Sequence, residues 1–331
     1  MSEHRIYPVF VPHSGCDFRC VFCNQSRITG AGDDPVRAIR RAVEAFDGAV
    51  GELAFYGGSF TAIPVREQEH LLMAAGAFLA LHPSNTIRVS TRPDCLTPDA
   101  VERLVRYGVR TVELGVQSMD REVLLASGRP VAPDCVDPAV ALLRRAGMRV
   151  ILQMMTGLPG DTPEKSRATA EAIIALRPAG VRIYPTVVVA GTPLAEMVQA
   201  GTYIPHTVEE AVTLCAALWP LFHRAGIPVI RLGLCPTDAL SDGGVLAGPY
   251  HPAFGQLVYA RIYRALAMEA LADHTGCSEV ILGVAYGAVS NLVGQRRENV
   301  QFLEERLGIG RIRVCEIDVG TFEVAVVFIA D

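Results

Sequence analysis

The sequence has 331 residues, 50% of them hydrophobic and 20% charged, so it can bury a sizeable core and is not that of a disordered chain. A net charge of -5 argues against broad, sequence-independent attraction to nucleic acid. The most apolar stretch, residues 71–81, is too short to cross a bilayer, and no apolar signal segment stands at the start. We therefore expect a cytoplasmic protein with no membrane partner.

Strand-like apolar runs alternate with amphipathic helical segments over the first part of the chain. The predicted strands are residues 7–12, 52–56, 86–91, 110–116, 149–154 and 180–185. The predicted helices between them are residues 35–46, 65–81, 98–107, 133–146 and 163–176. This order indicates parallel strands joined by right-handed crossovers. Since only one helix, residues 207–224, and one short strand, residues 228–232, follow, the fold class is predicted as α/β, with a partial (β/α)6 TIM-like barrel.

The pattern changes after Leu234, where a loop rich in Gly, Asp and Pro begins. The elements predicted beyond it are helices at residues 252–272 and 287–307 and strands at residues 279–284, 311–317 and 322–329. This set predicts a small C-terminal α+β unit. We place the barrel core at residues 1–235 and the C-terminal domain or lid at residues 236–331.

Nine cysteines occur in the chain, and three of them, Cys16, Cys20 and Cys23, crowd together between the first strand and the first helix. The crowding indicates a metal site rather than a disulfide framework. Three thiolates can hold three irons of a cubane 4Fe-4S cluster and leave the fourth iron open to another ligand. An alternative is a zinc ion bound by the same cysteines and His13. The other cysteines lack close spacing, so we expect buried thiols there.

The spacing C-x3-C-x2-C, with the aromatic Phe22 before the last cysteine, resembles the signature of the radical S-adenosylmethionine (SAM) superfamily. The resemblance implies that Cys16, Cys20 and Cys23 bind a 4Fe-4S cluster and that SAM binds its open iron. Reductive cleavage of SAM would then yield a 5'-deoxyadenosyl radical. A one-electron donor such as a flavodoxin or ferredoxin is implied as a partner. The chemistry belongs to the cofactors, and the protein positions and shields them.

Further residues resemble the SAM site of the superfamily. Gly57, Gly58 and Ser59 follow the second predicted strand and match the motif that holds the amino group of SAM. Two glycines allow close backbone approach to a ligand, although Gly-Gly after a strand is also an ordinary turn. Residues 155–162 resemble the turn beside the adenine pocket. The remaining candidate SAM ligands are Phe22, Ser90, Thr91, Arg92, Gln117 and Gln153.

Each of these candidates has an expected role and a structural alternative. Phe22 is expected against adenine, and Arg92 is expected to pair with the SAM carboxylate. The others lie near the ends of the third to fifth predicted strands, where related enzymes bind the carboxylate or the ribose. The alternative for a polar residue is a helix cap or a bound water, and the alternative for Phe22 is a core position.

Residues 7–232 resemble the radical SAM domain of the Elongator catalytic subunit and its bacterial stand-alone relatives, chiefly in residues 112–118, 155–160 and 183–192. Members of that family act on wobble uridine in tRNA and use a fused acetyltransferase domain. The residues after Leu234 are too few for such a domain, so the resemblance implies a tRNA or nucleotide substrate without specifying the reaction. A small metabolite or peptide substrate is one alternative, and a non-catalytic RNA- or protein-binding module with a structural metal site is another. The sequence indicates no oligomeric state.

Tyr250 and His251 lie in a proline-framed loop near the start of the C-terminal unit. We expect this unit to cover the open side of the partial barrel, because a radical must be kept from water. Tyr250 and His251 are then candidate catalytic residues that contact the substrate. The alternative is that a lone His in such a loop is structural.

Overall fold

The computed structural model describes residues 5–11, 15–16, 19–24, 34–237, 240 and 243–330. The chain divides into two compact units, one made of Met1–Thr207 and Leu221–Tyr250 and the other of Val208–Pro220 and His251–Asp331. This division differs from the predicted boundary between residues 235 and 236. The first part of helix α9 (Val208–Arg224) belongs with the C-terminal elements, where the ring of Trp219 lies 6.5 Å from that of Tyr259 on helix α11 (Phe254–Ala270).

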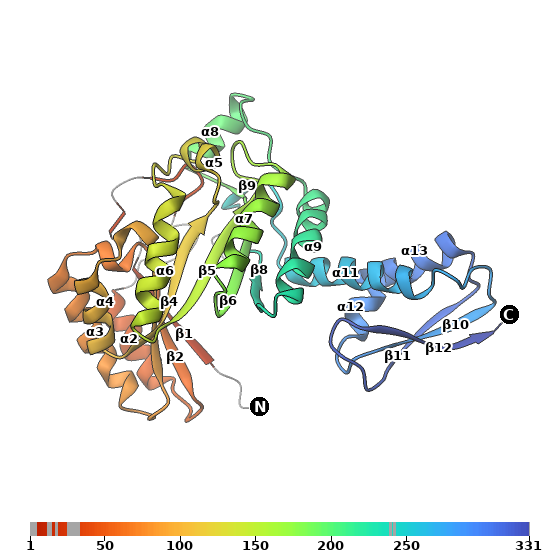
Figure 1. Cartoon of the computed structure of the whole chain (residues 1–331), viewed down its shortest axis with the longest axis horizontal. Coiled ribbons are helices and arrows are strands. Elements are labelled where there is room, and N and C mark those ends of the chain that lie inside the picture. Colours follow the sequence, from red (N-terminus) through yellow and green to blue (C-terminus); the bar gives the residue numbers. More distant parts are fainter. Residues whose placement is uncertain are drawn as a thin grey trace. The chain divides into compact units, whose positions relative to one another are not determined.

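The first unit is built on a seven-stranded sheet in which all paired strands are parallel (Figure 1). In the order in which they pair, the strands are β1 (Arg5–Val11), β2 (Gly51–Gly57), β3 (Thr86–Thr91), β4 (Val109–Gln117), β5 (Arg149–Thr156), β6 (Gly180–Pro185) and β8 (Val229–Leu232). The six strands predicted for the barrel are confirmed. The short strand predicted at residues 228–232 joins the sheet as its seventh member.

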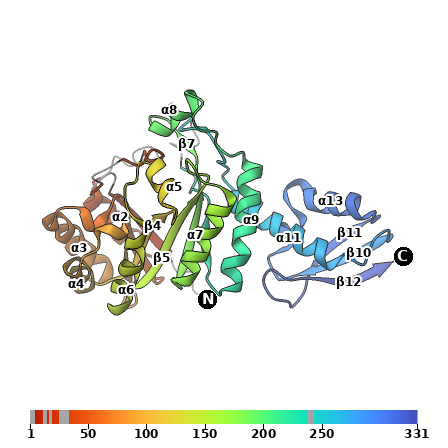
Figure 2. The same ribbon diagram turned by 45° about the horizontal axis from the view of Figure 1, so that its top comes forward.

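The helices of this unit alternate with the strands along the chain (Figure 2). They are α2 (Pro35–Glu44), α3 (Val65–Leu79), α4 (Pro98–Arg106), α5 (Arg121–Ala126), α6 (Val136–Arg145), α7 (Pro163–Ala175) and α8 (Pro193–Gln199). The five predicted helices are confirmed. The sequence analysis missed α5 and α8, because helices of six and seven residues are too short to show a clear 3.6-residue period.

Three of these helices begin with the same Thr-Pro pair. Thr97, Thr162 and Thr192 each stand at the N-cap, and each side-chain oxygen accepts a hydrogen bond from a backbone amide of the first turn. The proline that follows loses nothing by lacking an N–H, since that donor has no partner inside the helix. The start signals in the sequence therefore mark real helix ends.

The two faces of the parallel sheet differ in polarity. Leu53 and Phe55 on β2, and Ile87 and Val89 on β3, point to one face and are fully buried. The helices pack on this face, as shown by the ring of Tyr7 on β1, which lies 5.1 Å from that of Phe78 on α3. Strand residues alternate between the two faces, so the residues between these apolar ones point to the opposite, inner face.

The inner face is polar, and its contacts show how strongly the sheet curls. Nη2 of Arg182 on β6 donates a hydrogen bond of 2.9 Å to the hydroxyl of Tyr56 on β2. Three strands lie between β2 and β6, which would be about 19 Å apart in a flat sheet with a strand spacing of about 4.8 Å. Side chains can meet across that span only if the sheet closes around its inner face. The predicted partial barrel is thereby confirmed.

The second unit contains a three-stranded sheet in the order β11 (Ile312–Glu316), β10 (Glu279–Val284) and β12 (Val324–Ala330). The pair β10 and β11 is parallel, and the pair β10 and β12 is antiparallel. Leu282 of β10 packs in one buried cluster with Tyr263 and Leu271 from the α11 region. Helices α12 (Val289–Val293) and α13 (Glu298–Leu307) add Leu292 and Leu303 to that cluster. A small α+β unit is therefore present, as predicted.

The helix predicted at residues 287–307 is divided into α12 and α13. Gly294 ends α12 with a φ of 74°, and Arg296 and Arg297 adopt φ values of 50° and 64°. These left-handed conformations cannot continue a right-handed helix. Apolar periodicity continues across the break because both helices bury one face in the same core, and this misled the prediction.

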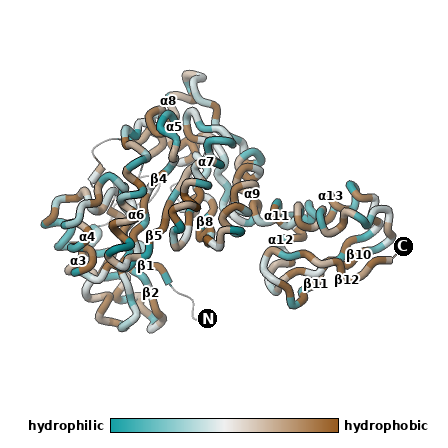
Figure 3. The backbone as a smooth tube through the Cα atoms, viewed as in Figure 1, coloured by the Kyte–Doolittle hydropathy of each residue, from teal (hydrophilic) through white to brown (hydrophobic). Residues whose placement is uncertain are grey.

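Hydrophobic residues are concentrated along the strands of both sheets (Figure 3).

A third, two-stranded sheet pairs β7 (Val188–Val189) with β9 (Val245–Ala247) in antiparallel fashion and was not predicted. Among the helices that the structure describes, none combines the length and the hydropathy that a membrane span requires.

Candidate active site

The cysteine loop follows β1 directly, at the carboxyl edge of the parallel sheet. Cys16, Cys20 and Cys23 are half-buried and none forms a disulfide. The amide of Cys23 donates a hydrogen bond of 3.1 Å to the carbonyl oxygen of Cys20. His13, the fourth ligand of the alternative zinc site, lies outside the described residues. The loop thus stands where the active sites of barrel enzymes form.

Gly15, the residue before the first cysteine, packs against the chain that follows β2. A Cβ at this position would lie 2.2 Å from the carbonyl oxygen of Ser59 and 2.9 Å from the amide nitrogen of Ile63. Gly15 also has a φ of +71°, which favours glycine. The sequence analysis missed this residue, although a glycine beside a cysteine motif was a visible signal. Gly15 brings the cysteine loop against the loop that contains Gly57 and Gly58.

The other half of the cysteine loop is bound on two sides. The amide of Val21 donates to the carbonyl oxygen of Ser127 over 2.9 Å, and the carbonyl oxygen of Val21 accepts from the amide of Leu194 over 2.9 Å. Phe22 packs against an apolar cluster that includes Leu194 and Tyr203. Its predicted contact with adenine stays a prediction. The packing anchors the loop between the end of α5 and the start of α8.

The residues at the ends of β2 and β3 are joined by a group of hydroxyls, which we call the hydroxyl clasp: the buried Ser59 and Thr91 and the half-buried Thr61. Oγ1 of Thr91 lies 2.6 Å from that of Thr61 and 3.3 Å from Oγ of Ser59. Oγ of Ser59 also accepts a hydrogen bond of 2.9 Å from the amide of Arg92. Ser59 and Thr91 therefore hold the two strand ends together, whatever else they bind.

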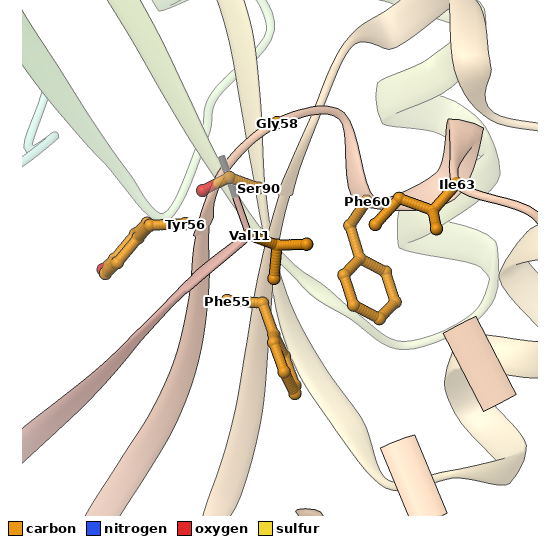
Figure 4. Close-up of a pocket in the computed structure, with 7 residues that line it drawn as sticks. All are labelled: Val11, Phe55, Tyr56, Gly58, Phe60, Ile63 and Ser90. Atoms are coloured by element: carbon orange, nitrogen blue, oxygen red, sulfur yellow. The ribbon is translucent and has the colours of Figure 1, made fainter. Parts of the chain in front are cut away.

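Gly57 and Gly58 form the turn between β2 and the hydroxyl clasp. Gly57 has a φ of 111°, and the amide of Gly58 donates a hydrogen bond of 2.9 Å to the carbonyl oxygen of Val11 at the end of β1. Gly58 and Ser90 line a narrow hollow with Phe55 and Phe60, and Tyr56 borders it with its ring pointing away from those two phenylalanines (Figure 4). The turn and the predicted ligand Ser90 are thus brought together at one edge of the sheet.

Arg92 forms a two-pronged ion pair within its own loop. Its Nε and Nη2 donate to the two carboxylate oxygens of Asp94 over 3.1 and 3.0 Å. A guanidinium engaged in this way already has a carboxylate partner. A SAM carboxylate would compete with Asp94 for Arg92.

Gln117 and Gln153 meet at the ends of β4 and β5. Nε2 of Gln153 donates a hydrogen bond of 3.0 Å to Oε1 of Gln117. Gln117 has a φ of 67°, an uncommon conformation for a residue with a side chain, and the register of β4 against β5 shifts between Gly115 and Gln117. Strained residues of this kind are concentrated at functional sites. The two predicted ligands are therefore brought together in a way consistent with a binding role.

The turn after β5 is held from both ends. The carboxylate of Asp161 accepts hydrogen bonds from the amide of Gly157 over 2.8 Å and from the hydroxyl of Ser166 over 2.7 Å. The hydroxyl of Tyr203 donates to the carbonyl oxygen of Gly157 over 2.6 Å. A Cβ on Gly157 would lie 2.9 Å from Nδ1 of His206. The predicted adenine turn is therefore a rigid element with an imidazole against it.

Arg129 is a buried arginine that the sequence analysis missed. It is 4% exposed, its Nη1 lies 4.0 Å from Sγ of Cys20, and its Nη2 donates to the carbonyl oxygen of Gly115. Burial raises the pKa of the Cys20 thiol, and the charge of Arg129 opposes that rise. Within the described ranges, Arg129 has no carboxylate partner. A buried guanidinium in this position attracts an anionic group.

A network of charged side chains, the lumen network, fills the inner face of the partial barrel below this edge. Nε of Arg88 donates to the carboxylate of Glu52 over 2.7 Å, and Nη1 of Arg88 donates to that of Glu113 over 3.3 Å. Nε of Arg182 lies 3.0 Å from the other oxygen of Glu113. The carboxylates and guanidiniums balance in charge. Sequence analysis missed the network because its members are distant in the chain and isolated in their strands.

Tyr250 and His251 have structural contacts of their own. Tyr250 packs against the apolar cluster of Val187, Val189 and Leu240. Nδ1 of His251 accepts a hydrogen bond of 3.1 Å from the amide of Ala253, the N-cap of α11. These contacts agree with a structural role, and the predicted substrate contacts stay predictions.

The cysteine loop has the chemistry of a 4Fe-4S site. Its thiols lie close together in sequence, are half-buried and belong to a loop anchored on both sides. Among the described residues, no group of three His, Cys, Asp or Glu side chains is arranged to hold a metal ion. The donor set, three thiols with no fourth cysteine nearby in the sequence, fits a cluster with three protein thiolates.

Residues 10–173 match the Radical SAM superfamily, and residues 178–264 match the Radical_SAM C-terminal domain. Together with the partial barrel and the cysteine loop, these matches define the class: the chain belongs to the radical SAM superfamily. It is accordingly an enzyme whose cofactors are a 4Fe-4S cluster and SAM, and it requires a one-electron donor.

More particular similarities lead to one branch of the superfamily. The chain is 32% identical over 175 residues to the tRNA uridine(34) acetyltransferase of Dehalococcoides mccartyi, covering 50% of this chain and 38% of the relative. It is 27% identical over 190 residues to Elongator complex protein 3 of Homo sapiens, covering 51% and 35%. The chain thus spans less than two fifths of the length of these relatives.

A solved structure shares the fold. The archaeal Elp3 of Methanocaldococcus infernus, with residues 1–46 deleted, superposes with a TM-score of 0.64 at 21% identity, covering 85% of this chain and 66% of the other. At this level of identity the likeness shows the fold alone.

Proposed function

We propose that this radical SAM enzyme modifies a nucleoside of tRNA. The observation that supports the proposal most directly is the sequence similarity to relatives named for tRNA uridine(34) and for Elongator complex protein 3. Because the chain spans only part of those relatives, we do not extend their acetyl chemistry to it. A polar inner face with half-buried tyrosines is also compatible with an uncharged, hydrogen-bonding substrate.

Cys16, Cys20 and Cys23 are the proposed ligands of the cluster. Once bound, the cluster supplies the electron that cleaves SAM and so generates the reactive radical. Arg129 lies beside Cys20 and is itself held by its hydrogen bond to Gly115 on β4, while the contacts of Gly15 and Val21 keep the loop against its neighbours. A flavodoxin or ferredoxin is the proposed electron donor.

The proposed SAM site combines the predicted residues with Arg129. Backbone carbonyl oxygens of Gly57 and Gly58 are the proposed acceptors for the amino group of SAM, and Gln117 and Gln153, which are hydrogen-bonded to each other, are proposed to bind its other polar groups. Arg129 is our first choice for the SAM carboxylate, since Arg92 is bound by Asp94. Arg92, Ser59, Ser90, Thr91 and Phe22 stay proposed as flanking residues, and Tyr250 and His251 as substrate contacts.

The test is anaerobic incubation of the reconstituted enzyme with dithionite, SAM and total tRNA, followed by mass spectrometry of the nucleosides. We expect a new nucleoside that is absent when the Cys20→Ala variant replaces the parent protein. If SAM is cleaved but no nucleoside changes, tRNA is not the substrate and a small metabolite or peptide takes its place. If SAM is neither bound nor cleaved, the result supports the alternative, a non-catalytic binding module with a structural metal site.

A further inference from the structure

Two phenols share one guanidinium on the inner face of the partial barrel. Nη2 of Arg182 donates to the hydroxyl of Tyr56 over 2.9 Å, and Nη1 donates to the hydroxyl of Tyr184 over 3.0 Å. Glu113 pairs with Nε of the same guanidinium. Both hydroxyls are therefore held at fixed positions and close to one another.

The direction of these hydrogen bonds decides what the phenols can still do. An arginine has five donors and no acceptor, so each phenol must accept and keeps its own hydrogen to donate. Among the described residues, no acceptor for either phenolic hydrogen is found. Burial raises the pKa of Tyr56 to about 12 and also raises that of Tyr184, so both hydroxyls keep their hydrogens at neutral pH.

The position of the phenols places these donors next to the proposed SAM site. Tyr56 immediately precedes Gly57, and its ring points away from Phe55 and Phe60, toward the face of the sheet that Ser90 shares (Figure 4). Tyr184 is the second-to-last residue of β6, and its register partner on β5 is Met155, two residues after Gln153. The two phenols thus lie on the inner face of the sheet, near the strand ends that carry the proposed SAM site.

The charge around the phenols indicates which acceptor they suit. Arg88 and Arg182 are balanced by Glu52 and Glu113, so no net positive charge is left to attract a phosphate. Neutral O–H donors in a charge-balanced surrounding suit uncharged acceptors such as carbonyl oxygens. The ring of Phe10 lies 6.4 Å from that of Tyr56 and adds an apolar, aromatic wall for a planar ligand.

We infer that Tyr56 and Tyr184 bind the substrate by donating hydrogen bonds to uncharged carbonyl oxygens of a planar ring, the class that includes pyrimidine bases. Arg182 is the positioning residue that fixes both phenols. This inference rests on the proposed action on tRNA and adds the chemical group that the enzyme recognises there.

The test uses the nucleoside that the enzyme modifies in total tRNA. Tyr56→Phe and Tyr184→Phe keep the rings and remove the donors, and each should lower kcat/KM for the tRNA about 10-fold, as expected for one lost hydrogen bond to substrate. The affinity for SAM and the unfolding midpoint should stay at parental values. Tyr286→Phe, at a tyrosine that is 73% exposed in the other unit, is the control and should change nothing.

A second arm leaves the protein unchanged and alters the ring. An RNA stem-loop with pyrimidin-2-one in place of uracil at the modified position lacks one carbonyl oxygen, and the parent enzyme should use it about 10-fold less well. One of the Phe variants should no longer distinguish the two RNAs, because its donor to that oxygen is already gone. Arg182→Lys should weaken this discrimination as well, whereas a purely structural role would lower stability and leave discrimination intact.

The outcomes separate the two proposals. If the parent enzyme modifies no nucleoside in total tRNA, the proposed function fails and this assignment falls with it. If the parent modifies tRNA but both Phe variants keep its kcat/KM, or if the two stem-loops are used equally well, the inference alone is overturned.

Discussion

At the candidate site, Arg129 and Gly15 contact residues that lie far away in the sequence. Arg129 reaches Cys20 and Gly115, and Gly15 touches the backbone at Ser59 and Ile63. Neither contact follows a local pattern. Three predictions concern individual residues of the cysteine loop and its surroundings.

Replacing Cys20 with Ala should abolish both the 4Fe-4S absorbance and the formation of 5'-deoxyadenosine, since a cluster with only two protein thiolates is poorly held. Cys277→Ala is the matched control, because that half-buried thiol lies in the other unit. Iron and sulfide content and the visible spectrum after anaerobic reconstitution measure the outcome. Equal loss in both variants would contradict the assignment of the ligands.

Replacing Arg129 with Gln should weaken SAM binding about 10- to 100-fold, because a buried charge-assisted pair with the SAM carboxylate is lost. Titration calorimetry of SAM against protein with matched iron content measures this change. Arg145→Gln, at an exposed arginine on α6, should bind SAM like the parent. Parental affinity in Arg129→Gln would instead favour Arg92 as the carboxylate ligand.

Replacing Gly15 with Ala should lower cluster incorporation, because the new Cβ would meet the Ser59 carbonyl oxygen at 2.2 Å and push the loop off the sheet. Gly147→Ala separates the causes: its φ of +72° is nearly the same, but no atom lies within 4 Å of the added Cβ. Both variants should lose about 1 kcal/mol through the backbone conformation, and only Gly15→Ala should also lose iron. Iron loss in both would show that the close approach is unimportant.

Short sequence signals mark where several helices begin and end. Thr-Pro pairs begin α4, α7 and α8, and Gly294 with the left-handed Arg296 and Arg297 divides α12 from α13. The loops at the carboxyl ends of the strands are held differently, by side chains that cross from one strand end to the next. The hydroxyl clasp between β2 and β3 is the clearest case.

Replacing Thr91 with Val should destabilise the first unit by about 1–3 kcal/mol, because the hydroxyls of Ser59 and Thr61 lose a buried partner while the side-chain shape is kept. Thr111→Val is the matched control. The Thr111 hydroxyl is buried on the neighbouring strand and has no partner in the described structure, so its removal should be neutral or stabilising. Denaturant melts of the two variants side by side decide between these outcomes.

At the level of the whole first unit, the lumen network connects four strands of the sheet. Glu52 on β2, Arg88 on β3, Glu113 on β4 and Arg182 on β6 form one chain of ion pairs across the curled sheet. Buried pairs of this kind contribute little net stability while intact, because desolvation offsets their attraction. Removal of one member leaves its partner charged, buried and uncompensated.

Replacing Glu113 with Gln should therefore destabilise the first unit by about 3–5 kcal/mol, since two guanidiniums are left with one carboxylate. Glu102→Gln, which breaks only an exposed pair with Arg106, should leave the midpoint unchanged. Because the chain has two units, the measurement should follow a probe inside the first, such as hydrogen exchange of β4 amides. A loss below about 1 kcal/mol in Glu113→Gln would mean that the network is flexible or solvated.

Local sequence patterns were sufficient for the strands of the barrel, its main helices and the position of the cysteine loop after β1. Period-2 and period-3.6 burial, capping residues and Gly-Pro turns act over a few residues, so they can be read from neighbouring positions. The same patterns failed for α5, α8 and the interruption at Gly294, where the elements are short or the core continues across the break.

The contacts that shape the candidate site needed the folded chain. Tyr56 and Arg182 are 126 positions apart, and Arg129 and Cys20 are 109 apart, yet each pair meets because the parallel sheet curls and brings its strand ends to one edge. A charged residue in a strand has the same local signature whether it faces solvent or a buried partner. Cys16, Cys20, Cys23, Gly57 and Gly58 could be chosen as candidates from the sequence because their spacing is local. The contacts of Arg129, Gly15 and the lumen network join distant parts of the chain, so they appear only once the strands have assembled into the sheet.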